Sequence, residues 1–205
     1  MLVQLRLRCV FCACGITEHH HPHQAHDEAG NVILIALGVC RHVIQCLRIK
    51  SPDVQTNAFQ AMMNLARDDG GAFTKVGACQ ILLRMLPEAS KSASPVLMVM
   101  LDCMYALALH NPQRQKQLEV GKIPLMNILS RHYEDPEIHK KAVVIASLLA
   151  YSTRDMNSFR PVVYMIRAYY RRMPSNLSET DPHSVNVQRV CAALLVRYNC
   201  LEDGL

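Results

Sequence analysis

The residue types best suited to chemistry gather in the first 30 positions of this chain. Three cysteines precede a histidine-rich tract, and the candidate ligands among them are Cys9, Cys12, Cys14, His19, His21 and His23. Thiolates and imidazoles are the ligands that zinc and copper prefer. A second cysteine pair is absent, and the histidines form a tandem run rather than the single separated pair of a zinc finger. We therefore interpret residues 1–29 as a disordered Cys/His-rich tail without a cofactor, with a metal site or a targeting peptide as alternatives.

Catalytic motifs are absent from the rest of the sequence. It contains no glycine-rich phosphate loop, no Gly-x-Ser-x-Gly and no His-Glu-x-x-His. The run Asp68-Asp69-Gly70-Gly71 resembles a site, but it is more typical of a helix end with glycine in a left-handed cap. A Cys–His nucleophile pair stays open as an alternative. The nine cysteines are scattered, which favours a structural role, and we predict that the protein is not an enzyme.

Composition narrows the functional class further. The 205 residues are 50% hydrophobic, contain no tryptophan, and carry 22 basic against 17 acidic side chains. The basic residues are spread along the chain, which argues against a nucleic-acid binder. Buried cysteines are typical of reducing compartments, so we expect a protein of the cytoplasm or nucleus. No apolar run reaches the roughly 18 residues of a membrane-spanning helix.

A short sequence motif that ends in Leu-Ala recurs at a fixed interval and indicates the architecture of the fold. Asn64-Leu65-Ala66, Ala106-Leu107-Ala108 and Leu148-Leu149-Ala150 are each separated by 42 residues. A period of this length is typical of stacked helical repeats. Because Leu65, Leu107 and Leu149 occupy equivalent places, we predict that all three are buried between adjacent units.

Each repeat has the same predicted anatomy. A glycine at 38, 77 or 121 precedes a first helix, and a polar turn that contains proline follows it. A longer helix then runs to the Leu-Ala motif. A short third helix closes each unit, over residues 71–76, 112–120 and 155–162. The predicted repeat domain covers residues 30–200, with units at 38–76, 77–120 and 121–162 and a divergent cap at 163–200.

These features resemble the armadillo-repeat family. The residues that carry the resemblance are the opening glycines, Ile123-Pro124, and Asp53-Val54-Gln55 followed by Asn64-Leu65-Ala66. The resemblance implies an all-α fold, a right-handed α-solenoid of about three to four three-helix repeats. It also implies a non-catalytic scaffold or adaptor that holds a protein or an extended peptide along a concave groove. The competing hypothesis is a metal- or redox-responsive protein that uses the N-terminal Cys/His cluster.

The resemblance implies that the third helix of each armadillo unit lines the groove, and we match that helix to the long helices that begin near residues 52, 95, 136 and 185. The expected groove residues are Asp53, Asn57, Gln60, Asn64, Asp102, Lys140, Lys141, Arg189 and Arg197. A plain solvated face is the alternative interpretation of this set. Gln60 stands where nuclear-import adaptors of the family carry tryptophan. The set is polar at one end and basic at the other, which predicts a mild preference for acidic segments, and the ends of the array could contact a longer repeat array.

Overall fold

The computed structural model describes residues 38–91, 94–109, 111–172 and 182–198, with the backbone alone for 67–71 and 182–187. Within these ranges every regular element is helical and no strand occurs, which confirms the predicted all-α class. The predicted tail and its metal-ligand candidates lie outside the described residues. The elements are α3 (Val39–Cys46), α4 (Pro52–Lys75), α5 (Ala78–Ala89), α6 (Pro95–Ala108), α7 (Pro112–Leu118), η1 (Glu119–Gly121), α8 (Lys122–Arg131), α9 (Pro136–Ser152), α10 (Met156–Tyr170) and α11 (Pro182–Arg197).

Three of the helices begin with the same local device. Ser94, Asn111 and Asp135 precede α6, α7 and α9, and each accepts a hydrogen bond from the backbone N–H three residues later at 2.9–3.2 Å. Proline follows each cap as the first helical residue, where its missing N–H leaves no hydrogen bond unmade. The start signals predicted at residues 94 and 135 are therefore confirmed.

The three opening glycines do not share one role. Gly38 and Gly77 have φ angles of 75° and 81°, in the left-handed region that glycine enters without steric cost. Gly121 has φ of −76°, outside the left-handed region, and is the last residue of η1 before α8 begins. A Cβ on Gly121 would lie 2.7 Å from Cδ2 of Leu83, so close packing against α5 explains the glycine there.

The predicted helix end at residues 68–71 is wrong, because α4 runs without a break over 24 residues. Gly70 and Gly71 are inside the helix, where each costs about 1 kcal/mol relative to alanine. Ala66 before them and Phe73 after them are both buried. Burial of apolar residues on both sides of the glycines therefore outweighs the local preference for a break.

The predicted boundary between units at residues 162 and 163 also needs correction. A single helix, α10, spans it, so the expected short helix at 155–162 and the start of the cap are one element. Phe159, Val162, Val163 and Ile166 are all buried on α10. Their helical spacing continues across the expected boundary, and residues 162–170 of α10 contain no glycine or proline to interrupt it.

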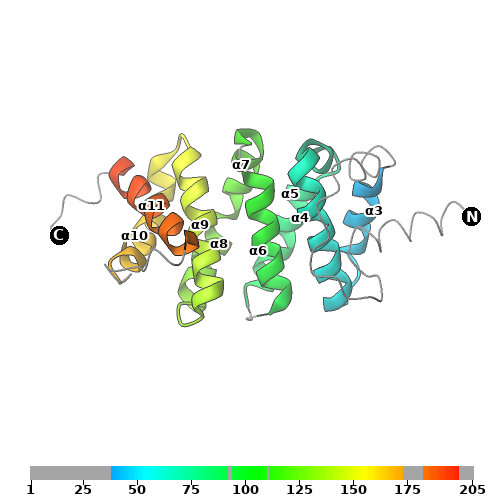
Figure 1. The fold of residues 1–205 in the computed structure, drawn as a ribbon, viewed down its shortest axis with the longest axis horizontal. Helices are drawn as coiled ribbons and strands as arrows, with labels where there is room; N and C mark the ends of the chain where they lie inside the picture. Colours follow the sequence, from blue (N-terminus) through cyan, green and yellow to red (C-terminus); the bar gives the residue numbers. More distant parts are fainter. Residues whose placement is uncertain (1–37, 92–93, 110, 173–181, 199–205) are drawn as a thin grey trace, which may run out of the picture.

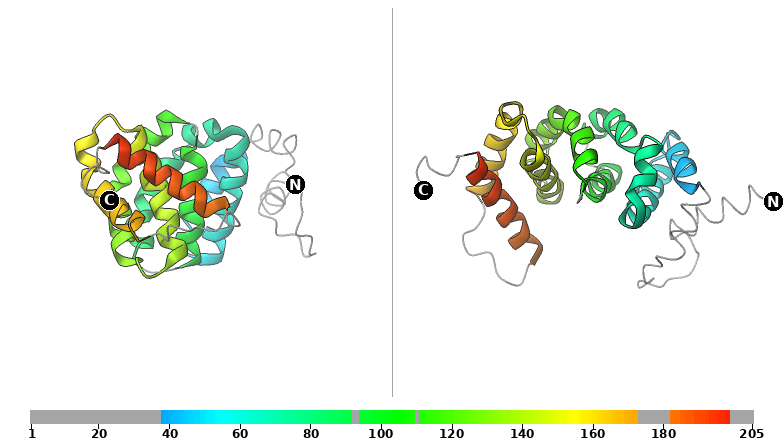
Figure 2. Two further views of the ribbon diagram at one scale, coloured as in Figure 1. Left: turned by 60° about the vertical axis from the view of Figure 1, so that its left-hand side comes forward. Right: turned by 90° about the horizontal axis from the view of Figure 1, so that it is seen from above.

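The helices form two layers of an arch. Figure 2 shows α4, α6, α9 and α11 along the inner, concave side, and α5, α8 and α10 on the outer side. Along the inner layer α4 contacts α6, α6 contacts α9 and α9 contacts α11, and Figure 1 shows these helices side by side. We call α4, α6, α9 and α11 the inner helices. This open stack is the predicted solenoid.

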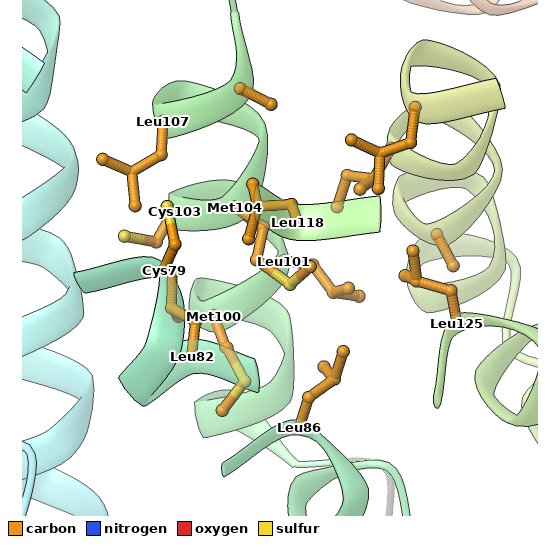
Figure 3. Packing of buried hydrophobic residues seen from close by; sticks show 14 of the residues in the cluster. Cys79, Leu82, Leu86, Met100, Leu101, Cys103, Met104, Leu107, Leu118 and Leu125 are labelled. Atoms are coloured by element: carbon orange, nitrogen blue, oxygen red, sulfur yellow. The ribbon is translucent and has the colours of Figure 1, made fainter. Parts of the chain in front are cut away.

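The core runs between consecutive units. Leu65, Leu107 and Leu149 are each 0% exposed, as the 42-residue spacing predicts. In Figure 3, Leu107 and Cys103 lie on the side of α6 that faces α4. A polar link repeats the same interval, because Nε2 of His132 lies 3.0 Å from the backbone oxygen of Ser90, 42 residues earlier.

A second histidine, His139, is buried within the C-terminal part of the stack. Its ring centroid lies 4.7 Å from that of Tyr169 on α10. Burial, and secondarily the nearby Arg172 guanidinium, lower the pKa of His139 below its ordinary range. The folded protein therefore resists protonation of this side chain.

We expect Leu107→Ala to lower the free energy of unfolding by about 2–5 kcal/mol, because it opens a cavity between α6 and α4. Leu109→Ala is the matched control, since Leu109 is 37% exposed and two residues away. Urea unfolding followed by circular dichroism measures both. Equal losses in the two variants would show that the 42-residue register is wrongly assigned.

We expect acidification from pH 7.5 to 5 to destabilise the protein more than its His139→Leu variant. The pKa of His139 is lower in the folded state than in the unfolded chain, so the unfolded chain binds the proton first and gains stability as the pH falls. The stabilisation is thus fully present above the ordinary histidine pKa of about 6.5 and declines below it. Parallel pH profiles of the unfolding free energy would contradict this assignment.

Candidate protein-binding face

Each inner helix leaves one strip of side chains uncovered. The members recur at intervals of three and four residues, and they are exposed or half-buried while the remaining sides of the helix are packed. Because neighbouring helices cover the other sides, the strips face the hollow of the arch. We call these residues the inner face: Asp53, Thr56, Asn57, Gln60, Met63 and Asn64 on α4; Pro95, Met98, Val99, Asp102, Tyr105, Ala106 and Leu109 along α6; Glu137, Lys140, Lys141, Val144, Leu148 and Tyr151 on α9; and Arg189, Val190, Ala193, Val196 and Arg197 on α11.

All nine groove residues expected from the sequence fall on this inner face. Gln60 and Asn64 interact with each other, since Nε2 of Gln60 donates to Oδ1 of Asn64 at 3.3 Å. On α11, residues 189 and 197 are exposed, in keeping with the alignment of that helix to α4. The structure thus places the candidates on one surface.

Two of the charged candidate residues on the inner face pair with each other. Lys141 of α9 forms an ion pair with Asp102 of α6, so two of the candidates neutralise each other. Both side chains are partly exposed, and such a pair contributes only about 0–1 kcal/mol to stability. Lys140 and Arg189 also lie on the inner face, near the N-terminal halves of α9 and α11. The Lys141–Asp102 pair links two consecutive inner helices.

Arg197 has a structural role beside its place on the inner face. Its guanidinium lies 5.0 Å from the ring centroid of Tyr151 and donates a hydrogen bond of 3.2 Å to the backbone oxygen of Thr153. The next residue, Tyr198, donates from its hydroxyl to the oxygen of Ala150 at 3.1 Å. The end of α11 is therefore fastened to the end of α9, and the Tyr151 ring is held in place by a cation–π contact.

An apolar band crosses the inner face, and the nine candidate residues from the sequence do not include it. The band consists of the large exposed side chains Tyr105, Leu109, Tyr151, Val190 and Val196, together with half-buried Val144 and Leu148 on α9. Five of the ten exposed large hydrophobic residues among the described positions belong to it. The signal was present, because Leu109 and Tyr151 are 42 residues apart and lie in helical register with Asp102 and Val144.

Three of the five cysteines among the described residues, Cys79, Cys103 and Cys191, are poor nucleophiles. Burial raises the pKa of Cys79 and of Cys191 to about 11, and it raises the pKa of fully buried Cys103 still more clearly. These thiols stay protonated at neutral pH, and their burial keeps substrates away. Among the described positions no three His, Cys, Asp or Glu side chains gather as metal ligands. In the same part of the chain, no helix combines the length and apolar character that crossing a bilayer requires.

The fold is shared with designed proteins. No family model and no curated protein matches the sequence. Among solved structures, computationally designed armadillo repeat proteins for modular peptide recognition superimpose with a TM-score of 0.67 at 17% identity, over 98% of this chain and 81% of the other. An engineered protein superimposes with a TM-score of 0.66 at 14% identity, over 94% of this chain and 72% of the other. The chain therefore has an armadillo-like fold.

We expect thiol reagents to modify Cys46 well before Cys79, Cys103 and Cys191 in the native protein. Cys46 is only partly buried, whereas the other three are enclosed and have strongly raised pKa values. Peptide-resolved mass spectrometry after timed alkylation measures each rate, with urea-unfolded protein as the control. Native labelling of Cys103 as fast as that of Cys46 would contradict the burial described for this core.

Proposed function

We propose that this protein is a non-catalytic scaffold that binds a segment of a partner protein along its inner face. The observation that carries the proposal is the apolar band across α6, α9 and α11. Contiguous exposed apolar surface is a mark of interaction sites on proteins. Tyrosine is enriched at the residues that dominate binding energy, and two tyrosines lie in this band.

The surroundings of the band define the chemistry of the segment. Apolar side chains of the partner would cover Leu109, Tyr151 and Val196, while acidic side chains would meet Lys140 and Arg189. The acidic contacts set orientation and association rate more than affinity, because they are exposed to solvent. The best partner is therefore an extended segment in which apolar residues supply the energy and a few acidic residues supply direction.

The structural comparison supports a peptide as the ligand. The designed armadillo proteins with the same fold are described as made for modular peptide recognition. An open stack of repeats presents a long concave surface, which suits an extended chain. The concave shape of the fold and the side chains exposed on it thus both support an extended peptide as the ligand.

A matched pair of tyrosines allows a sharp test. Tyr151 is 51% exposed with Arg197 5.0 Å from its ring, and Tyr133 is 53% exposed with Arg172 5.1 Å from its ring. Tyr151 lies in the band, whereas Tyr133 lies in the turn between α8 and α9. Replacing either tyrosine by alanine removes a ring of similar exposure and a similar cation–π contact. The two variants therefore differ mainly in the position of the lost ring on the protein surface.

We expect peptides selected from a random display library on the wild-type protein to lose at least tenfold in affinity for Tyr151→Ala. A tenfold loss corresponds to about 1.4 kcal/mol. Tyr133→Ala should change the affinity by less than about twofold, a difference of only about 0.4 kcal/mol. Fluorescence anisotropy with the selected peptides measures both. If the two variants bind with equal affinity, the inner face is not the binding surface.

A further inference from the structure

A basic hollow lies in the first unit of the stack, away from the inner face. Its volume is about 500 Å3, and its walls come from α3 and from the turn between α4 and α5. Three cationic side chains line it, Arg41 and Arg48 from α3 and Lys75 from the end of α4, together with the Gln45 amide. None of its lining residues belongs to the inner face, so the hollow is a separate feature of the molecule.

The three cations of this hollow have no counter-charge in the described part of the chain. Among the described residues that line the hollow none is acidic, and no described carboxylate forms an ion pair with Arg41, Arg48 or Lys75. By contrast, the cation Lys141 on the inner face is paired with Asp102. A concave site lined by one sign of charge concentrates the field and attracts oppositely charged ligands.

The shape of the hollow favours a small group over a broad surface. Its walls come from two separate segments, residues 41–48 and 75–77. Gly77 adds no side chain, and a Cβ there would meet only Oε1 of Gln80, at 3.4 Å. The space can therefore hold a compact anion with the few atoms attached to it. The three cations belong to two short segments rather than to several helices, which suits one compact anion more than the broad surface of a bilayer.

We propose that this hollow binds the phosphate of a phosphorylated serine or threonine in a partner protein. A phosphoryl group carries a charge of about −1.5 to −2 and three acceptor oxygens. Two guanidinium groups can each offer parallel N–H donors to those oxygens, and a lysine adds a point charge. A carboxylate has a single charge and two oxygens, so it would leave part of the cationic set unused. The donor set thus matches a phosphate monoester.

The test uses the full chain and a fluorescein-labelled peptide with one phosphoserine among glycines and alanines. The comparison ligand is the same peptide with serine. The double variant Arg41→Gln, Arg48→Gln removes two cations of the hollow. The matched control, Arg84→Gln with Arg131→Gln, removes the same charge from two other exposed arginines that do not line it.

We expect the phosphopeptide to bind at least tenfold more tightly than the serine peptide, and inorganic phosphate to compete with it. The hollow variant should lose at least tenfold in affinity for the phosphopeptide, and the control variant less than twofold. Added salt should weaken binding because the contacts are electrostatic. Circular dichroism confirms that both variants keep the wild-type fold.

Several outcomes would overturn the proposal. Equal affinity for the two peptides would show that the protein does not recognise the phosphate. An equal loss of affinity in the control variant would show that the loss follows from the change in net charge and not from the hollow. Binding of inorganic phosphate without the phosphopeptide would assign a small-anion site instead. Arg41- and Arg48-dependent binding to phosphatidylserine vesicles, with no binding of the phosphopeptide, would assign a membrane contact.

Discussion

Packing between consecutive inner helices is the interaction on which the rest of this structure depends. A single helical unit has apolar residues on more than one side and cannot bury them alone. Leu65, Leu107 and Leu149 are fully buried where consecutive units meet. The 42-residue interval in the sequence follows from this need for burial, because each unit presents an equivalent leucine to its neighbour.

The same stacking creates the surface that we propose binds a partner. Each inner helix is covered by its neighbours and by the outer layer, so one strip remains open on the concave side. Because the units repeat, the strips align, and residues such as Leu109 and Tyr151 at the 42-residue interval lie on neighbouring inner helices. The polar links between units, Lys141 with Asp102 and Arg197 with Thr153, lie at this surface.

Regular features of the fold could be predicted from sequence, and features that depend on distant contacts could not. The period, the proline starts and the buried leucines are local or repeated signals, and they were sufficient for the solenoid. Local rules failed at Gly70-Gly71 and at residues 162–163, where packing kept a helix intact. Candidate groove residues were found by register. Two features, the ion pair of Lys141 with Asp102 and the apolar band, depend on which exposed residues are neighbours in space. A single sequence does not contain that information.

The central claim is that each unit is stabilised by its immediate neighbours. Native-state hydrogen exchange, read peptide by peptide in the wild type and in Leu149→Ala, tests it most directly. We predict the greatest loss of protection in α9 and in the helices that contact it, α6, α7, α8, α10 and α11. We predict the smallest loss in α3, at the other end of the described stack. A uniform loss from α3 to α11 would contradict the claim, since that is the response of a single closed core.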